Sequence, residues 1–234
     1  MTGSLRSRPE WGTHQWKPDT YGLSVLGIPL EVWRPTGDCA LLIFAGIHGE
    51  EPETTYALSR ALRQLVTRPT RCAVVLAANP DGLIRGTRGN ARGVDLNRNF
   101  PTRDWREGTV THRSTLKDPS DVLLSTGSHA GSEPETLALL SLIRDLRPKA
   151  VIAMHAPLAC IDDAHASPLG EMLARRTGMP LVREIGYATP GSFGTWGLEN
   201  DLPVITYEFP LTSTEDLMQT HVPVLVELLS RHEF

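Results

Sequence analysis

Four short apolar runs recur along the chain, each bounded by glycine, proline or polar residues. They cover residues 40–45, 72–78, 150–154 and 203–207. None alternates between apolar and polar positions, as a strand with one solvated face would. Continuous apolar runs of this length are typical of strands buried on both faces, as in a largely parallel sheet. We therefore predict four buried strands at these positions.

In much of the chain between and after these runs, apolar residues recur at the spacing of a helix. This spacing predicts helices at residues 55–66, 136–146, 168–177 and 213–229. Pro223 lies inside the last helix and should bend or interrupt it, because proline has no backbone donor. Strands that alternate with helices indicate an α/β protein.

The remaining segments have weaker patterns. Residues 1–20 are polar and predict an irregular surface arm, and residues 21–33 predict a β-hairpin. Residues 79–82, Asn-Pro-Asp-Gly, have the composition of a turn. We predict loops at residues 85–115 and 158–163. The first of these is long, and long loops without structure of their own are usually functional.

Length and composition favour one domain over two. The chain has 234 residues and a hydrophobic content of 40%, which suffices for one sizeable core. We expect residues 1–20 to form the arm and residues 21–234 to form a single domain. The net charge of −4 and the lack of a basic run argue against a nucleic-acid partner. No apolar run approaches the roughly 18 residues of a membrane span, so no membrane partner is expected.

The cysteines and the N-terminus bear on the compartment. Cys39, Cys72 and Cys160 are odd in number and lie in or beside apolar runs. Buried free thiols in a reducing cytoplasm fit this pattern better than a disulfide framework. The first residues lack the apolar stretch of a signal peptide. We therefore expect a cytoplasmic protein.

Side chains with metal and acid–base chemistry follow three of the four apolar runs. His48 and Glu51 come after the first run, His155 directly after the third and Glu208 directly after the fourth. Open α/β sheets place their ligands at these strand ends. Each residue alone is more typical of a polar loop or a structural side chain, but their recurrence favours a site. A catalytic zinc takes three nitrogen or oxygen ligands, so we predict one zinc ion on His48, Glu51 and His155, with Glu208 as general base.

The string Gly-Val-Asp-Leu-Asn-Arg-Asn-Phe-Pro at residues 93–101 carries further candidates. Arg98 offers a planar fork for a carboxylate, and Asn97 adds a directional hydrogen bond. Arg88 is a candidate for stabilising the oxyanion that forms when a carbonyl is attacked. For Arg88 taken alone, a solvated loop charge is the better interpretation.

Together these residues resemble the zinc carboxypeptidase family. That family has His-x-x-Glu after a strand, an Asn-Pro-Asp-Gly turn, a Gly-Val-Asp-x-Asn-Arg-Asn motif, a later histidine and a late glutamate, all present here in order. The chain is most similar to the bacterial members that cut murein peptides between γ-D-glutamate and meso-diaminopimelate. This closer resemblance rests on residues 93–101, 132–136, 157–162 and 189–196, and it spans residues 33–210.

The resemblance implies a mixed, largely parallel twisted sheet flanked by helices on both faces, in one catalytic domain. It implies that Arg88 polarises the scissile carbonyl and that Asn97 and Arg98 hold the substrate carboxylate. It also implies that Tyr187 swings over the substrate. Ala156 departs from the pattern, because related amidases tend to have aspartate directly after the third ligand.

A diaminopimelate leaving group carries a second, distal centre with an ammonium and a carboxylate. Its pocket needs an acceptor for the ammonium that is not a metal ligand. Asp162 and Asp163 follow the third ligand within one segment, and Asp162 belongs to the shared string at residues 157–162. We therefore expect Asp162 to bind the ammonium. The alternative is that both carboxylates cap the following helix or face water.

The expected activity is zinc-dependent hydrolysis of a small murein tripeptide in cell-wall recycling. The alternatives are a general metallocarboxypeptidase or an acylamino-acid deacylase of the same superfamily, and a catalytically inactive metal- or peptide-binding protein. The complete set of ligands and base argues against the inactive protein. We expect the other histidines to be solvated or structural, with a role in binding substrate as the alternative for His112 and His129, which lie in polar stretches near the site. The oligomeric state stays open, with a homodimer as one option.

Overall fold

The computed structural model describes residues 5–113 and 121–232. At its centre lies a six-stranded sheet in the order β4-β3-β7-β10-β8-β9. Every neighbouring pair is parallel except β10 and β8, which are antiparallel. The predicted mixed, largely parallel sheet is therefore confirmed. The strands are β3 (Leu41–Phe44), β4 (Cys72–Val75), β7 (Ala150–His155), β8 (Leu158–Asp162), β9 (Leu181–Val182) and β10 (Val204–Pro210).

The four predicted apolar runs are four neighbouring strands of this sheet. All residues of β3 and β4 are buried, because helices or loops cover both faces and leave no solvated side. β10 is longer than its apolar run, so Glu208 lies within the strand and not after it. Glu208 pairs in register with His155, the last residue of β7, which brings both side chains to the same level of the sheet.

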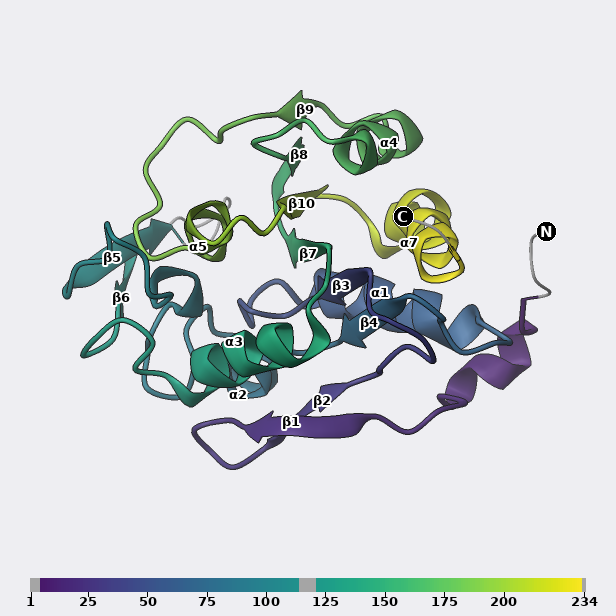
Figure 1. The fold of residues 1–234 in the computed structure, drawn as a ribbon, viewed down its shortest axis with the longest axis horizontal. Coiled ribbons are helices and arrows are strands. Elements are labelled where there is room, and N and C mark those ends of the chain that lie inside the picture. Colours follow the sequence, from purple (N-terminus) through teal and green to yellow (C-terminus); the bar gives the residue numbers. More distant parts are fainter. Residues whose placement is uncertain (1–4, 114–120, 233–234) are drawn as a thin grey trace.

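Helices cover the two faces of the sheet (Figure 1). One apolar cluster packs α1, α4 and α7 against the sheet, and a second packs α3 and the first residue of α5 against the other face. The helices are α1 (Pro52–Gln64), α2 (Pro80–Arg85), α3 (Pro134–Leu146), α4 (Pro168–Thr177), α5 (Phe193–Glu199), α6 (Thr214–Asp216) and α7 (Val222–Leu229). A π-helical segment, Leu217–His221, joins α6 to α7, so the last predicted helix is interrupted just before Pro223, as expected.

Two local predictions were wrong. The segment predicted as a loop at residues 158–163 contains strand β8, which pairs antiparallel with β10 and buries Cys160 and Ile161. The predicted turn at residues 79–82 is the start of helix α2. The Asn79 side chain accepts a hydrogen bond from Gly82 N and caps that helix, so turn composition and helix capping share the same residue types here.

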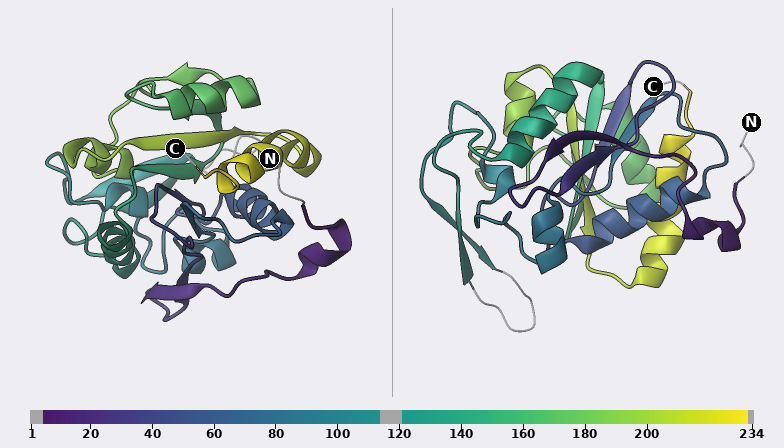
Figure 2. Two further views of the ribbon diagram at one scale, coloured as in Figure 1. Left: turned by 45° about the vertical axis from the view of Figure 1, so that its right-hand side comes forward. Right: turned by 90° about the horizontal axis from the view of Figure 1, so that it is seen from below.

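The long loop predicted at residues 85–115 contains regular structure within its described part. A 3₁₀ turn occupies Leu96–Arg98, and β5 (Thr109–Arg113) pairs antiparallel with β6 (Asp121–Ser125). This hairpin projects from the body of the protein (Figure 2). Residues 114 and 115 lie outside the described residues.

The N-terminal arm is partly ordered. Its first four residues lie outside the described part of the chain, and a 3₁₀ helix follows at Arg8–Gly12. The backbone of Arg6 donates to Gln64 O at 2.8 Å, which fastens the arm to the end of α1. The predicted hairpin is present as β1 (Asp19–Leu23) and β2 (Pro29–Val32), and β1 starts inside the expected arm.

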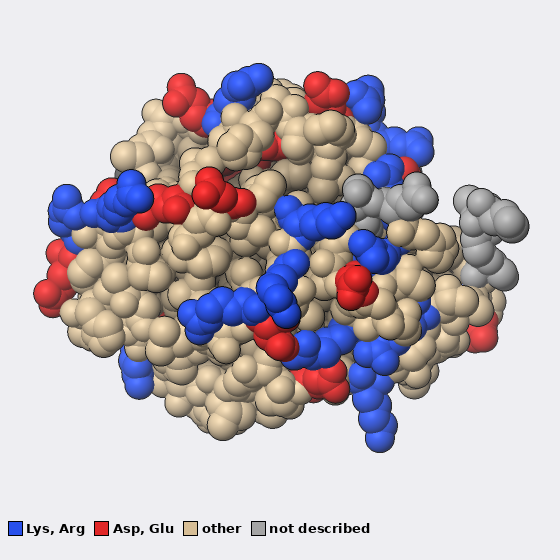
Figure 3. All heavy atoms as spheres, in the orientation of Figure 1, with Lys and Arg blue, Asp and Glu red and all other residues tan. Residues whose placement is uncertain are grey.

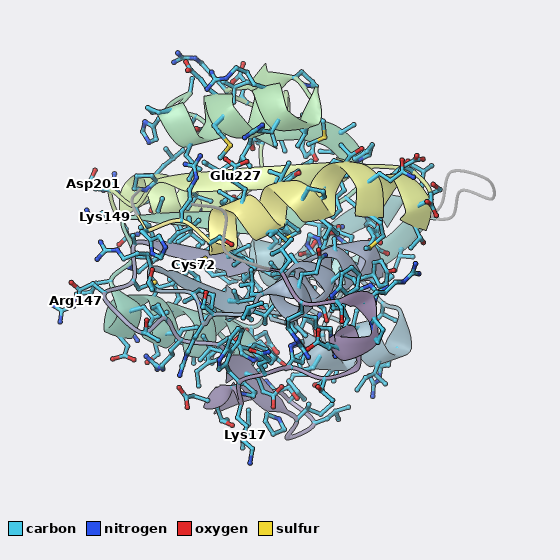
Figure 4. The ribbon with its side chains drawn as sticks, turned by 90° about the vertical axis from the view of Figure 1, so that its right-hand side faces the viewer. Lys17, Cys72, Arg147, Lys149, Asp201 and Glu227 are labelled. Atoms are coloured by element: carbon cyan, nitrogen blue, oxygen red, sulfur yellow. The ribbon has the colours of Figure 1, made fainter. Side chains whose placement is uncertain are left out.

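Burial and surface charge complete the description. All three cysteines are free and buried, as predicted; Cys72 lies inside the molecule, whereas Lys17 and Arg147 reach its surface (Figure 4). On the face in Figure 3, basic and acidic side chains are interspersed, so no single sign of charge dominates that face. Within the described residues, none of the helices has both the length and the apolarity that crossing a bilayer requires.

Candidate active site

One open pocket of about 280 Å³ lies at the carboxyl ends of β3, β7 and β10. All nine residues singled out from the sequence line it: His48, Glu51, Arg88, Asn97, Arg98, His155, Asp162, Tyr187 and Glu208. They come from segments far apart in the chain. Parallel pairing of the strands brings them together, because it sets the carboxyl ends side by side.

The three predicted metal ligands form a buried cluster. Their candidate ligand atoms all lie within 4.8 Å of one another. The Nδ1 atoms of His48 and His155 are 3.2 Å apart. Glu51 Oε1 lies 2.8 Å from His48 Nδ1, and Glu51 Oε2 lies 3.2 Å from His155 Nδ1. Two imidazole nitrogens and both oxygens of one carboxylate therefore converge on one point.

These three residues fit a metal ion. Glu51 Oε2 is buried and makes no hydrogen bond of acceptable geometry among the described residues, although His155 Nδ1 lies 3.2 Å away. Such an arrangement costs free energy unless a cation satisfies the oxygen. Two ligand nitrogens on a tetrahedral zinc, at about 2.0–2.1 Å from the metal, are about 3.3 Å apart, close to the spacing of the two Nδ1 atoms here. Burial alone would raise the pKa of Glu51, but the two histidines hold it well below its usual range.

The loop that carries His48 is fixed by the start of α2. Asn79 Nδ2 donates to Ile47 O at 3.1 Å while its Oδ1 caps α2. Gly49 packs directly on Gly82, and a Cβ atom at Gly49 would lie 2.0 Å from the carbonyl carbon of Gly82. Only glycine permits this approach. The Asn-Pro-Asp-Gly segment therefore positions the first metal ligand.

Asp95 is a functional residue that the sequence reasoning missed. Its Oδ1 lies 3.2 Å from His48 Nε2, and its Oδ2 accepts a hydrogen bond from Arg88 Nε at 2.9 Å. A carboxylate at Nε2 keeps the proton there and leaves Nδ1 free to bind metal. Burial alone would raise the pKa of Asp95, but Arg88 and His48 hold it well below its usual range. The sequence offered one general signal for Asp95: a histidine that binds a metal through one ring nitrogen usually donates its other N–H to a carboxylate.

Arg88 is held by three carboxylates. Besides Asp95, its Nη1 lies 3.3 Å from Glu50 Oε1 and 3.4 Å from Glu51 Oε1. Burial opposes its charge, but these neighbours raise its pKa above the usual arginine value. The solvated loop charge favoured for Arg88 taken alone is therefore wrong. Its guanidinium lies at the wall of the pocket beside the metal cluster.

Glu208 lies in the pocket near the cluster and is only 7% exposed. Its Oε2 accepts a hydrogen bond from Leu158 N at 3.4 Å. Burial, with the negative charge of Glu51 added to it, raises the pKa of Glu208, although His155 opposes the shift. A carboxylate with a raised pKa is a better proton acceptor than an ordinary glutamate.

Asn97 and Arg98 differ in how much of their hydrogen-bonding capacity is already used by other residues of the protein. Asn97 Oδ1 accepts a hydrogen bond from Phe193 N at 2.8 Å, so the start of α5 fixes this side chain. Arg98 Nη1 donates to Asn97 O at 2.7 Å. Among the described residues, the Arg98 guanidinium has no carboxylate within ion-pair distance, so it can accept one from a ligand.

The two neighbouring aspartates have different surroundings. Asp163 is buried, and its oxygens accept hydrogen bonds from the backbone of His165 and Ser167 ahead of α4, so the structural interpretation holds for Asp163. Asp162 lines the pocket, and the structure shows no hydrogen bond or ion pair for its carboxylate among the described residues. Burial, with Glu208 and Asp163 nearby, raises the pKa of Asp162 to about 6. Tyr187 also lines the pocket and is 57% exposed.

His112, for which the sequence favoured a solvated or structural role and left a substrate role as the alternative, lies at the site. It comes from β5, and its Nε2 is 2.7 Å from Glu50 Oε1. It lines the same pocket as the metal cluster. The long spacing between His112 and the motifs left no signal for this contact in the sequence.

Comparison with known proteins agrees with this site. A model of the zinc carboxypeptidase family matches residues 20–161. Murein peptide amidase A of Escherichia coli (strain K12) is 45% identical over 231 residues, covering 97% of this chain and 95% of that protein. Murein peptide amidase A of Vibrio campbellii (strain ATCC BAA-1116) is 42% identical over 98% of this chain and 94% of that protein.

Solved structures extend the comparison. The murein-tripeptide amidase MpaA of Escherichia coli O157 superimposes with a TM-score of 0.92 at 43% identity, and 99% of each chain is covered. Thrombin-activatable fibrinolysis inhibitor superimposes with a TM-score of 0.70 at 18% identity, over 91% of this chain and 69% of that one, and shows the shared fold alone. On the family match and these identities, the chain is a hydrolase that belongs to the zinc carboxypeptidase family.

Proposed function

We propose that this protein is a zinc-dependent amidase that hydrolyses the bond between γ-D-glutamate and meso-diaminopimelate in murein tripeptides. The observation that carries the proposal is that the metal cluster and Glu208 share one pocket with Arg98, which has no carboxylate partner among the described residues. The relatives named as murein peptide amidases, which match nearly the whole chain, supply the substrate class. We place the activity in cell-wall recycling in the cytoplasm, where the buried free thiols fit a reducing compartment.

The residues divide the chemistry between them. His48, Glu51 and His155 would hold the zinc ion, which when bound polarises a carbonyl and lowers the pKa of water to about 7. Glu208 takes the proton from the attacking water and returns it to the leaving amine. Arg88 donates hydrogen bonds to the carbonyl oxygen as it becomes negative. Burial of the arginine strengthens that interaction, since little water competes for it.

The substrate is positioned by groups on the far side of the pocket. Arg98 and Asn97 bind the carboxylate beside the scissile amide, and Tyr187 covers the bound substrate. The proposal is tested by mass-spectrometric assay of zinc-loaded protein on L-Ala-γ-D-Glu-meso-diaminopimelate. A panel of ordinary C-terminal peptides and N-acyl amino acids separates the amidase from a general carboxypeptidase or a deacylase. Cleavage of the panel with no cleavage of the tripeptide would reject the proposal.

Arg98→Ala should mainly weaken binding of substrates that carry the free carboxylate. Charge-assisted hydrogen bonds contribute about 1.5–3 kcal/mol, so KM should rise about 10- to 100-fold. A substrate amidated at that carboxylate should be cleaved about equally by both proteins. Arg92→Ala is the matched control, because Arg92 lies in the same loop but pairs with Glu133 outside the pocket. Equal losses on both substrates would mean that Arg98 only supports the loop.

Asp162→Asn should raise KM for the tripeptide about tenfold, because a neutral amide replaces the charged carboxylate that accepts hydrogen bonds from the distal ammonium. KM for an analogue whose leaving group has a plain apolar side chain should not change. The pKa of Asp162, about 6, adds a pH test. Below pH 6 the carboxyl group is protonated and loses its charge, so KM for the tripeptide should rise there and KM for the analogue should not. Unchanged preference between the two substrates would place specificity elsewhere.

A further inference from the structure

A second cavity of about 420 Å³ adjoins the active site. Arg88 and His112 line both cavities, whereas Glu50 lines only the second. These three side chains therefore form the partition between the two spaces. The far wall of the second cavity comes from the β5–β6 hairpin, with Val122 and Leu123 exposed on it by 40% and 69%. The hairpin projects from the body of the protein (Figure 2).

Within the described part of the chain, Glu50 contacts the other two partition residues through one carboxylate oxygen. Its Oε1 lies 2.7 Å from His112 Nε2 and 3.3 Å from Arg88 Nη1. The structure shows no contact for Glu50 Oε2 among the described residues. One oxygen of a carboxylate that lines the second cavity is therefore open to a ligand, and its chemistry suits a cation that donates hydrogen bonds.

The partition also fixes which part of the substrate reaches the second cavity. In the proposed function Arg88 meets the carbonyl oxygen, and Arg98 meets the carboxylate on the leaving group. The chain attached to the carbonyl carbon must then leave on the side of Arg88 away from Arg98. Because Arg88 and His112 border both spaces, the second cavity is the space beside Arg88 into which we infer that the acyl chain extends.

We propose that the second cavity is a subsite for the amino-terminal end of the substrate, with Glu50 as acceptor for its free ammonium. The proposal rests on the proposed function, since it takes the acyl part to be an aminoacyl-γ-glutamyl group. Val122 and Leu123 provide apolar surface for a small side chain such as that of alanine. Arg85 lines the same cavity and donates only to Ala91 O at 3.4 Å among the described residues, so it offers a cation to the free α-carboxylate of the glutamyl unit.

The test compares three substrates that differ only at the amino terminus: the free tripeptide, its N-acetyl form and its N,N-dimethyl form. Acetylation removes the positive charge of the amino terminus, whereas dimethylation keeps that charge and adds bulk. The wild type should cleave the acetylated substrate at least about tenfold less efficiently in kcat/KM, with a smaller loss for the dimethyl substrate. Equal cleavage of all three would overturn the subsite and leave the proposed function intact. No cleavage of any of them would instead reject the proposed function.

Glu50→Gln identifies the acceptor. It should lower kcat/KM for the free tripeptide about tenfold more than it lowers kcat/KM for the acetylated substrate, and the difference should lie mostly in KM. The matched control is Glu53→Gln. Glu53 is three residues further along the chain and lines neither cavity, and its substitution removes the same charge. If Glu50 merely held Arg88 in place, both substrates would be cleaved more slowly by the same factor, and that result would overturn the proposal.

Two further measurements avoid any disturbance of Arg88. Leu123→Lys places a cation on the opposite wall and should weaken the free tripeptide while sparing the acetylated one. Calorimetric titration of zinc-loaded wild type with the product L-Ala-D-Glu should give binding at least about tenfold tighter than with N-acetyl-L-Ala-D-Glu. Equal binding of the two dipeptides, or equal losses in Leu123→Lys, would place the amino terminus outside this cavity.

Discussion

Glu208→Gln should keep its zinc and lose about 10²- to 10⁴-fold in kcat, the usual contribution of a general base. Glutamine preserves the shape of the side chain and its hydrogen bond from Leu158 N, but it cannot accept a proton from water. Glu208 lies outside the metal cluster, so metal content should match that of the wild type. KM should change little, because the residue acts on the attacking water and makes no contact that binds the substrate in the ground state.

The measurement is kcat on the tripeptide together with elemental analysis of the same sample. Glu184→Gln is the matched control, because Glu184 lines the same pocket and the structure shows no polar contact for it among the described residues. That variant should stay within about twofold of the wild type, the range expected for a surface change. Near-full turnover in Glu208→Gln would show that another group is the base. Loss of zinc in it would mean that Glu208 supports the metal.

The central sheet was predictable because burial on both faces leaves a direct trace in the sequence. β3 and β4 are fully buried and appear as unbroken apolar runs. The metal cluster followed from them, since parallel strands bring the residues after each run to one edge. β8 was missed because only two consecutive residues of it, Cys160 and Ile161, are buried and its segment starts beside Pro157, so its apolar run is too short to distinguish from a loop.

Contacts between distant loops were not predictable. Asp95 meets His48 across 47 positions of the chain, and His112 meets Glu50 through a hairpin that the sequence did not indicate. Such contacts depend on how the 3₁₀ turn and the β5–β6 hairpin fold back onto the sheet, and no local periodicity records that. The chemistry of the metal cluster was therefore predictable from the sequence, whereas the partners that orient its ligands required the structure.

His155→Ala should abolish both zinc binding and detectable hydrolysis. Two ligands remain, His48 and Glu51, and a site with two protein ligands does not reproduce the three that a catalytic zinc uses. The wild type should contain one zinc ion per chain, and the variant should contain none after the same reconstitution. His165→Ala is the matched control, because His165 is exposed and lies outside the pocket.

The same pair of variants separates loss of metal from loss of fold. Zinc at about a thousandfold above its dissociation constant stabilises the folded state by about 4 kcal/mol, which corresponds to a rise in Tm of roughly 10 °C for a chain of this size. This rise should occur in the wild type and in His165→Ala and be absent in His155→Ala. Without zinc, all three proteins should unfold cooperatively, because the two apolar clusters do not depend on the metal. A zinc-dependent rise in the Tm of His155→Ala, or a fourth protein ligand in a zinc-bound structure, would contradict the three-residue site.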